Sequence, residues 1–498
     1  MSRSQHLGAA VFLSGLVLAS GCTLGPEPAR PVTAVDASET WTHAKSQETI
    51  EPPQISPWWQ TFGDETTTEL VELALRNNTD LQAAAARVLE AEAALRRAHG
   101  ARLPQVGVGA SGATQRFSFV LPEIGRRSID ATTYSYNLNV SWQADLLGRL
   151  KRTQQSSWAS LLAQEEARQA MVHTVVSLVV RSRVLVATAE RALAINRQIT
   201  KSWESTTNTV ERRYRAGLAG AVELHLAREN LAAVRASEAV IAGQLEQARL
   251  ALDVLVGRRP GSGSPLPDTL PELPSLEPVP LGLPAALLDR RPDLRQAEMQ
   301  LASATYGVGA AIANLYPDLS LTGSVGGTAD RINDLTLTDG LVYNAIANLV
   351  GPIFSGGQRR ADVDAARARV EHATALYAGA VLTALREVED ALVLGDSTRL
   401  NWEFSDQRVF EARAADRLAK QRYQRGVETL LTVLETERRL RLAEQAIITA
   451  TADVWNARID LFLALGGDWG TDPLVTDTAD TEPDEASSHY ESTKTRTR

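Results

Sequence analysis

The chain has 498 residues, which is enough for a large hydrophobic core and for more than one structural layer. Charged residues make up 22% and aromatic residues only 5%, and Ala, Leu, Arg, Glu and Gln are concentrated in the middle of each half, as in long helices. The net charge of -9 at pH 7 argues against a nucleic-acid-binding protein, and a single cysteine excludes an internal disulfide.

The N-terminus has the pattern of an exported protein. The apolar run Leu7–Leu18 is too short to span a membrane, so residues 1–21 are predicted to be a cleaved signal peptide. Small residues precede Cys22, as in the bacterial lipobox, where the cysteine sulfur is lipidated and becomes the first mature residue. We predict a covalent lipid on Cys22 and a lipid-anchored segment over 22–63; the alternative is a chance cysteine in an ordinary signal peptide. Thr23, rather than Asp, as the second mature residue favours the outer membrane.

The segment 64–257 combines long helical patterns with two strand patterns. Stretches without Gly or Pro predict the helices over 64–99 and 149–215, and alternation of small or apolar with polar residues predicts the strands. The longest helix, at 1.5 Å per residue, would be a rod of roughly 100 Å. In chain order the predicted elements are a helix over 64–99, strands at about 105–120 and 133–146, and helices over 149–215 and 222–256.

A proline-rich linker over 258–292 leads to a second segment, 293–467, which repeats this order of patterns. The polar tail, 470–498, is predicted to be disordered. The predicted elements of the second segment are a helix over 293–315, strands at about 318–327 and 341–354, and helices over 358–425 and 429–465.

The two segments are copies of one unit. A shift of 213 residues sets Asp80 on Asp293, and a shift of 209 residues aligns the later parts without a gap. The second shift sets RYRAG, at 213–217, on RYQRG, at 422–426. The chain is therefore predicted to be an internal duplication of a helix-strand-strand-helix-helix unit.

The sequence predicts no catalytic residue, no metal and no cofactor apart from the lipid on Cys22. Gly107, Gly109 and Gly112 match G-x-G-x-x-G, but the dinucleotide motif needs a strand before it and a helix after it. Here a helix precedes and a strand pattern continues. Carboxylates are expected on solvated helix faces, and an enzyme is the weakest interpretation.

The four predicted strands allow two interpretations. They could form a small periplasmic sheet, or they could span the outer membrane. A membrane barrel needs at least about eight strands, and an open sheet edge is not tolerated in lipid. If the strands span the membrane, several copies must combine them, and the protein is an obligate oligomer.

Taken in order, these features resemble the TolC-like outer-membrane efflux proteins, in particular the lipoprotein branch that serves tripartite resistance-nodulation-division (RND) pumps. The resemblance covers residues 22–469. It is carried by CTLGPEPARP after the signal, WWQTFGD at 58–64, RRPDLRQAE at 290–298, GPIFSGGQRRADV at 351–363, RYQRGVETLLTVLETERRL at 422–440 and ALGGDW at 464–469.

This resemblance implies a mainly α fold with a small β part. It implies a homotrimer whose twelve strands form one outer-membrane β-barrel, continuous with a long periplasmic α-helical barrel. Such a protein is a passive exit duct for drugs or other small toxic compounds, loaded by an inner-membrane RND-type transporter and a periplasmic adaptor. It would be anchored in outer-membrane lipid, would extend into the periplasm, and would not be an enzyme.

The paired turns are predicted to dock the adaptor, as they do in the family. Gly217 and Gly426 fit the C′ position of a helix end, where a left-handed backbone favours glycine, and the next residue is placed for an accompanying apolar contact. The alternative is a helix end that needs no partner. The predicted docking residues are Arg213, Tyr214, Gly217, Leu218, Arg422, Tyr423, Gly426 and Val427.

The second copy carries the predicted periplasmic gate. The family has an aspartate and an arginine after this turn, at positions matched here by Glu435 and Arg438, and Leu431 matches an apolar constriction residue. The first copy has Leu226 and Glu229 at the equivalent places. In a trimer Glu435 would become a ring of three carboxylates, which favours cations. Glutamate reaches about 1.5 Å further than aspartate, so a changed gate geometry is expected.

A non-channel periplasmic coiled-coil lipoprotein that bridges the layers of the envelope is the alternative function. Alternation in four strands and the aromatic pair Trp58 and Trp59 favour the channel.

Overall fold

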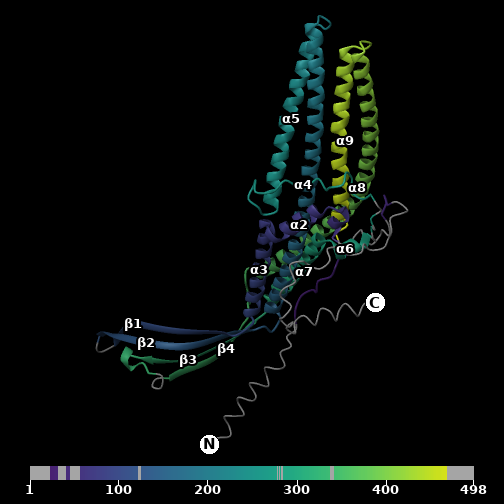
Figure 1. Cartoon of the computed structure of the whole chain (residues 1–498). Helices are drawn as coiled ribbons and strands as arrows, with labels where there is room; N and C mark the ends of the chain where they lie inside the picture. The colour runs from purple at the N-terminus through teal and green to yellow at the C-terminus, as the bar shows by residue number, and fades with distance from the viewer. Residues whose placement is uncertain are drawn as a thin grey trace. The chain divides into compact units, whose positions relative to one another are not determined.

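The computed structural model describes residues 23–31, 41–44, 57–121, 125–276, 279, 281, 284–336 and 341–467 (Figure 1). The predicted signal peptide, Cys22 and the predicted disordered tail lie outside these residues, as does about half of the segment 22–63. The chain forms two compact units. The first draws on 1–39, 79–174 and 287–386, and the second draws on 40–78, 175–286 and 387–498, so both repeats contribute to each unit.

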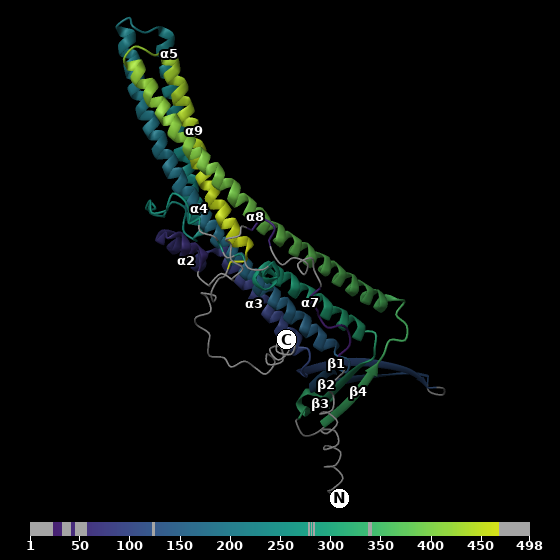
Figure 2. The same cartoon turned by 90° about the vertical axis from the view of Figure 1, so that its right-hand side faces the viewer.

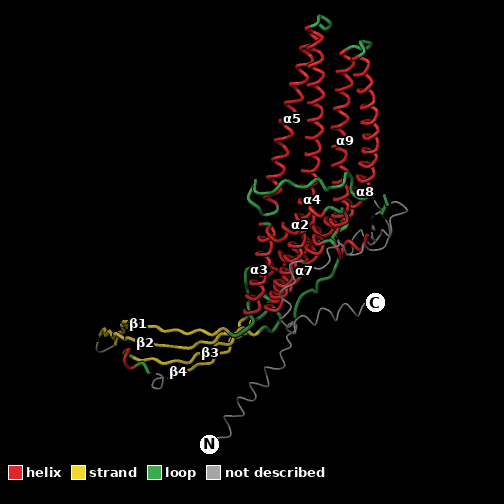
Figure 3. The backbone as a smooth tube through the Cα atoms, viewed as in Figure 1, coloured by secondary structure: helices red, strands yellow, loops and turns green. Residues whose placement is uncertain are grey.

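The first unit contains an antiparallel sheet with strand order β1-β2-β3-β4 (Figure 3). β2 of the first repeat pairs with β3 of the second, from Tyr134↔Ala329 to Ala144↔Leu319, so the repeats share one sheet. Within the described chain, β1 and β4 each keep one unpaired edge. The strands are β1 Gln105–Leu121, β2 Gly125–Ala144, β3 Asp318–Ala329 and β4 Leu341–Val350.

Two strand bounds differ from the prediction. β2 begins at Gly125 rather than near residue 133, because residues 126–132 keep their antiparallel register with β1 although they are mostly polar. β4 ends at Val350, short of the predicted end, since Pro352 has no N–H to donate to a strand ladder.

The register gives the sheet one apolar and one mainly polar face. Residues directly opposite on paired strands point to the same side, and successive residues alternate between sides. This division holds for the part of the sheet that includes residues 105–113 of β1 and the residues paired with them. There, one side carries Val106, Val108, Ala110, Tyr134, Tyr136, Leu138, Val140, Trp142, Leu319, Leu321, Val325, Leu341, Tyr343, Ala345, Ala347 and Leu349. The other side is polar on β1, β2 and β3 but mixed on β4, where it includes Val342, Ile346 and Val350; its polar residues are Ser111, Thr133, Ser135, Asn137, Asn139, Ser320, Thr322, Ser324, Asn344 and Asn348.

The described residues that follow Cys22 are attached at the base of this sheet. The Leu24 N–H donates to the Leu147 carbonyl (3.3 Å), just beyond the end of β2. Arg152, whose side chain is 1% exposed, donates to the Leu24 carbonyl (2.9 Å) and to Glu27 (2.7 Å). The chain next to Cys22 is therefore held beside the strands.

The two repeats contribute corresponding helices to the first unit. α3 Thr79–Gly100 and α7 Pro292–Ala313 accompany the first parts of α4 Arg149–Arg215 and α8 Gln358–Gln424 (Figure 2). Small residues join α4 to α7, since the Ser156 hydroxyl donates to the Ser303 carbonyl at 3.0 Å.

The second unit contains two helical hairpins. α4 leads into α5 Ala221–Leu255, and α8 leads into α9 Leu430–Ala464; the two hairpins lie side by side in both views (Figures 1 and 2). The apolar stretch of α4 is packed inside the chain, since its buried residues include Val172, Val175, Val176, Val179, Val180 and Val184. α4 is also the one described helix long and apolar enough to cross a membrane, but 61% of its apolar window is buried within the chain. Packing accounts for this apolar character.

The tryptophan-rich motif at 58–64 forms part of the core of the second unit. Trp58 stacks on Phe462 with ring centroids 5.5 Å apart, and Phe62 meets Trp455 edge-on at 4.9 Å. Beside them the Asp64 carboxylate forms a fully buried ion pair with Arg183 (3.1 Å). Burial acts to raise the pKa of Asp64, but hydrogen bonds from threonines and the charge of Arg183 outweigh it and lower the pKa.

The predicted helix over 64–99 is wrong in one respect, because it is two helices. α2 Glu65–Asn77 ends at Asn78, which is extended, and α3 begins at the next residue. The Asn78 side-chain amide donates to the Leu255 carbonyl at 2.8 Å, at the end of α5. This long-range hydrogen bond holds the helix break, although the local sequence contains neither Gly nor Pro.

Candidate functional site

Both predicted turns end their helices in the same way. Gly217 and Gly426 have φ angles of 72° and 74°, the left-handed region that favours glycine. The Leu218 N–H donates to the Arg213 carbonyl (2.8 Å), and the Val427 N–H makes the equivalent bond to the Arg422 carbonyl at 3.1 Å. The N–H groups of Gly217 and Gly426 donate in turn to the carbonyls of Tyr214 (3.0 Å) and Tyr423 (2.9 Å). This pair of hydrogen bonds makes each turn a Schellman motif.

The apolar residue after each glycine does not pack as predicted. Leu218 is 68% exposed and Val427 is 62% exposed, although an apolar contact usually accompanies this motif. The turn is closed by its backbone hydrogen bonds and by glycine, so the side chain is not needed for that purpose. Each turn consequently presents an exposed apolar side chain.

The two copies of the turn differ in their tyrosines. Tyr214 is 43% exposed, whereas Tyr423 is 6% exposed and lies in a cluster with Val210, Ala227 and Leu430. The Arg213 guanidinium lies 4.7 Å from the Tyr423 ring centroid and donates to the Tyr423 carbonyl at 3.4 Å. Burial raises the pKa of Tyr423. Arg213 and Tyr423 therefore join the two hairpins, whereas Tyr214 remains at the surface.

The three predicted gate residues lie on α9. Leu431 is 71% exposed, and the Glu435 carboxylate accepts two hydrogen bonds from Arg438, both 2.9 Å long. Arg439, which the sequence reasoning missed, donates a third at 2.7 Å. These bonds from Arg438 and Arg439 lower the pKa of Glu435 to about 2. A spacing of four residues between Glu435 and Arg439 is the sequence signal that could have identified it.

A second charged cluster lies buried between the hairpins. The Lys420 ammonium contacts Glu437 (2.6 Å), Asp416 (2.9 Å) and the hydroxyl of Ser202 on α4 (2.9 Å). Both carboxylate residues are 7% exposed, so the expectation that helix carboxylates face solvent is wrong for them. Burial raises the pKa of Glu437, and the nearby charge of Asp416 adds to this effect, although Lys420 acts to lower the pKa. Burial acts to lower the pKa of Lys420, but the charges of Glu437 and Asp416 outweigh it and raise the pKa.

The glycines that match G-x-G-x-x-G lie inside strand β1. Gly107 faces the side chain of Asn139 and Gly109 faces that of Asn137 on β2, so small residues here make room for the partner's amides. In the part of the chain that the structure describes, no three His, Cys, Asp or Glu side chains gather as metal ligands would.

The chain matches the outer membrane efflux protein family twice, over residues 70–258 and 283–467. It is 32% identical to the outer membrane protein OprJ of Pseudomonas aeruginosa, over 94% of this chain and 97% of that protein. It is 32% identical to the pyoverdine export outer membrane protein OpmQ of the same species, over 92% of this chain and 98% of that protein. The chain is 30% identical to CusC of Escherichia coli, which is named a cation efflux system protein, over 90% of this chain and 96% of that protein.

Solved structures agree with these matches. The outer-membrane channel OprN superposes with a TM-score of 0.82 at 29% identity, covering 90% of this chain and all of that one. The CmeC channel of Campylobacter jejuni superposes with a TM-score of 0.82 at 25% identity, covering 91% and 96%.

A sheet with one apolar face and two open edges, joined to paired helical hairpins, defines the class of outer-membrane efflux channels, which are transport proteins and not enzymes. The chain belongs to the outer membrane efflux protein family, and it lies in the outer membrane. The alternative of a non-channel envelope-bridging lipoprotein is thereby excluded.

Proposed function

We propose that three copies of this chain form one duct that passively conducts small toxic compounds out of the cell. The sheet carries this proposal, because its β1 and β4 edges are open and lipid does not tolerate an open edge. Four strands cannot close a barrel, whereas twelve strands from three copies fall within the known range. β4 of one copy would pair with β1 of the next, as β2 pairs with β3 inside one copy.

The partners in this proposal are a periplasmic adaptor and an inner-membrane RND-type transporter. The exposed Leu218 and Val427 support an adaptor contact at the turns, since exposed apolar side chains on two equivalent turns suit a partner's helical tip. The relatives are named for export of pyoverdine, toluene and cations, so the exported compounds differ within the family. The transporter, rather than the duct, would choose among them.

We also propose that Cys22 carries the lipid anchor. The hydrogen bond from Leu24 to Leu147 supports this, because it holds the chain two residues from Cys22 at the base of β2. An acyl chain attached there would reach the lipid beside the strands without a long linker.

The function is tested by conductance. The full-length protein, purified from membranes and added to planar lipid bilayers, should give stepwise single-channel currents. A heat-denatured sample should give none. If the native protein inserts into the bilayer, as shown by protease protection, but carries no current, the proposal of a duct is wrong.

A further inference from the structure

The exposed face of α9 after the second turn carries more positive than negative charge. Its carboxylate, Glu435, has a side chain that is 40% exposed, and its guanidinium groups, Arg438 and Arg439, are 52% and 69% exposed. Leu431 and Leu442, one turn before and after this cluster, are 71% and 40% exposed. The cluster is thus a charged band between two apolar positions.

The charge of this band is fixed over the physiological pH range. The pKa of Glu435 is lowered to about 2 by its hydrogen bonds from the two arginines, so the carboxylate is ionised at any pH above about 4. Guanidinium groups stay protonated in proteins. One guanidinium balances the carboxylate, and the second leaves one excess positive charge in each copy.

The neighbouring carboxylates of α9 cannot balance that excess. Glu437 is buried against Lys420, and Glu444 is 7% exposed and bound by Arg413 at 3.0 Å. Both face the helix interfaces and both already contact a cation, which Glu437 shares with Asp416. From its first residue to Glu444, α9 exposes no other acidic side chain.

We propose that this cluster makes the narrow end of the duct selective for anions, and that Arg439 is the residue that sets the preference. The inference rests on the proposed duct and on the prediction, made from the family resemblance, that Glu435 lies at its narrow end. Three copies would form a ring with three excess positive charges, and charged rings in a narrow pore decide which ions enter. Apolar side chains on either side strengthen the field of such a ring. The cation preference expected from a ring of carboxylates is thereby reversed.

The first hairpin offers the competing arrangement. Glu229 and Asn230 on α5 occupy the places of Arg438 and Arg439, and Glu229 is exposed. If α5 contributed equally to the narrow end, Glu229 would cancel the excess charge, and the duct would have no preference.

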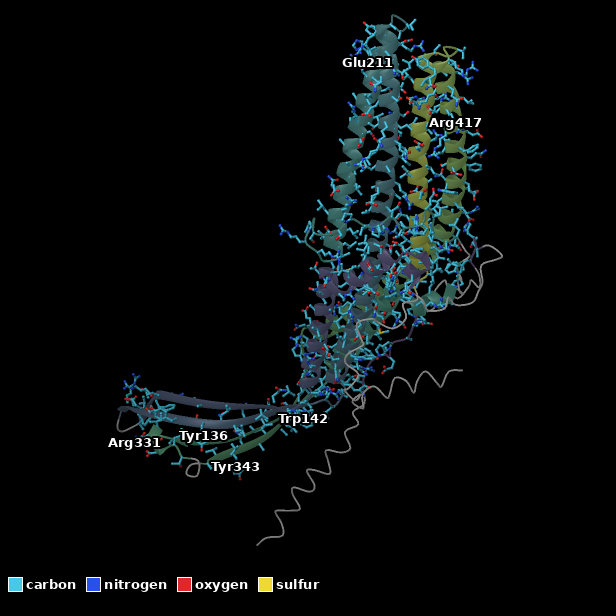
Figure 4. The ribbon with its side chains drawn as sticks, viewed as in Figure 1. Tyr136, Trp142, Glu211, Arg331, Tyr343 and Arg417 are labelled. Carbon is cyan, nitrogen blue, oxygen red and sulfur yellow. The ribbon has the colours of Figure 1, made fainter. Side chains whose placement is uncertain are left out.

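The experiment is a zero-current potential measured across a planar bilayer with a tenfold KCl gradient. For the full-length wild-type protein, the zero-current potential should have the sign expected when chloride permeates more readily than potassium. This potential should change little between pH 5 and 8. Arg439→Ser should move the potential toward zero or to the cation sign, and Arg439→Lys should keep the wild-type value, because it keeps the charge. Arg417→Ser, on the neighbouring helix α8 (Figure 4), removes the same charge from an exposed site outside the cluster and should change nothing.

Three results would overturn the inference: a cation preference in the wild type, an unchanged potential in Arg439→Ser, or an anion preference that appears only after Glu229→Gln. The last result would show that both hairpins line the narrow end. A wild-type protein that carries no current contradicts the proposed duct itself, so the two failures are distinguishable.

Discussion

Tyr214 and Tyr423 come from one ancestral position, yet one is at the surface and the other is almost fully buried. Single residues thus separate the roles of the two repeats. Arg213 lies over the ring of Tyr423 and so belongs to the joint between the hairpins, whereas Arg422 has a side chain that is 61% exposed beside Glu428. The same division applies downstream, where Glu435 replaces the Leu226 of the first repeat.

At this scale we expect Glu435→Ala to raise the conductance of the closed trimer. Among the described residues of one copy, the Glu435 carboxylate bonds only arginines of its own helix, so we expect any closing contact that it makes to come from another copy. Removing it leaves three arginine pairs that repel one another across the constriction. Single-channel recording measures the effect, and Leu226→Ala on α5 serves as the control. Unchanged conductance would place the constriction elsewhere.

Arg422→Glu should weaken binding of the adaptor. Arg422 is exposed at the turn and pairs only loosely with Glu428 (3.4 Å), so its reversal leaves the hairpin joint intact. Site-specific crosslinking between the turn and the co-expressed adaptor measures binding, and drug resistance of the cells reports function. Arg213→Glu is a poor probe of docking, because it also breaks the contact with Tyr423. If Arg422→Glu crosslinks to the adaptor as well as the wild type does, Arg422 is not part of a docking site, and the alternative of a helix end that needs no partner is favoured.

At the scale of elements, the hairpins are joined by buried charge as well as by apolar packing. Ser202 of α4, Lys420 of α8 and Glu437 of α9 meet where two carboxylates share one ammonium. Burying ionised groups with an unequal count of charges is costly, and removing the single cation would be strongly destabilising, by roughly 3–5 kcal/mol. This cluster therefore makes the contact between the hairpins depend on the protonation of Glu437.

The pH dependence of that contact has a defined sign. Because burial raises the pKa of Glu437, its contribution to stability is complete below its ordinary pKa and is lost as the pH rises through the raised value. Glu437→Gln stays neutral, so it should match the wild type at low pH and should keep more hydrogen-exchange protection in the hairpins at pH 8. Glu444→Gln, whose carboxylate pairs with a single arginine, is the control. A Glu437→Gln variant that is less protected at every pH would show that the ion pair with Lys420 dominates.

The sequence predicted the elements well, and side-chain contacts between distant segments account for most of what it missed. The long helices, the duplicated order of elements and the paired glycines follow from sequence patterns, and the structure contains them; the predicted helix over 64–99 is the exception, because it is two helices. The break at Asn78 has a local signal that was missed, since an asparagine before Thr79 and Asp80 is typical of a helix start, and the hydrogen bond to the Leu255 carbonyl adds a long-range contact. The burial of Asp416 and Glu437 likewise depends on α4, and the two apolar turn residues remained exposed because the backbone alone closes the turn.

For the whole molecule, the two faces of the sheet decide which side meets lipid. Tyr136 and Tyr343, labelled on the sheet in Figure 4, share the apolar face, and Asn137 and Asn344 share the polar one. β1 has 17 residues and β2 has 20, more than the 9–11 that a tilted strand needs to cross the hydrocarbon core. In the proposed barrel, the outer ends of these strands project beyond the membrane.

Adjacent substitutions on β2 test this assignment. Leu138→Arg places a charge on the lipid face and should cost up to about 2–4 kcal/mol, depending on depth, whereas Asn137→Arg on the polar face should be tolerated. The yield of SDS-resistant oligomer in the outer-membrane fraction measures the difference. Equal yields from the two variants would mean that the faces are assigned wrongly.

The pairing of β2 with β3 has a consequence for how this chain arose. The bond between the repeats is an ordinary antiparallel ladder, the same chemistry that would join β4 of one copy to β1 of the next. A half-length ancestor with two strands could therefore have closed the same twelve-stranded ring from six copies. Such a ring has only one kind of turn. Once two halves were fused, their turns could diverge. One turn then kept an exposed tyrosine, and the other gained a buried tyrosine and a glutamate held by two arginines.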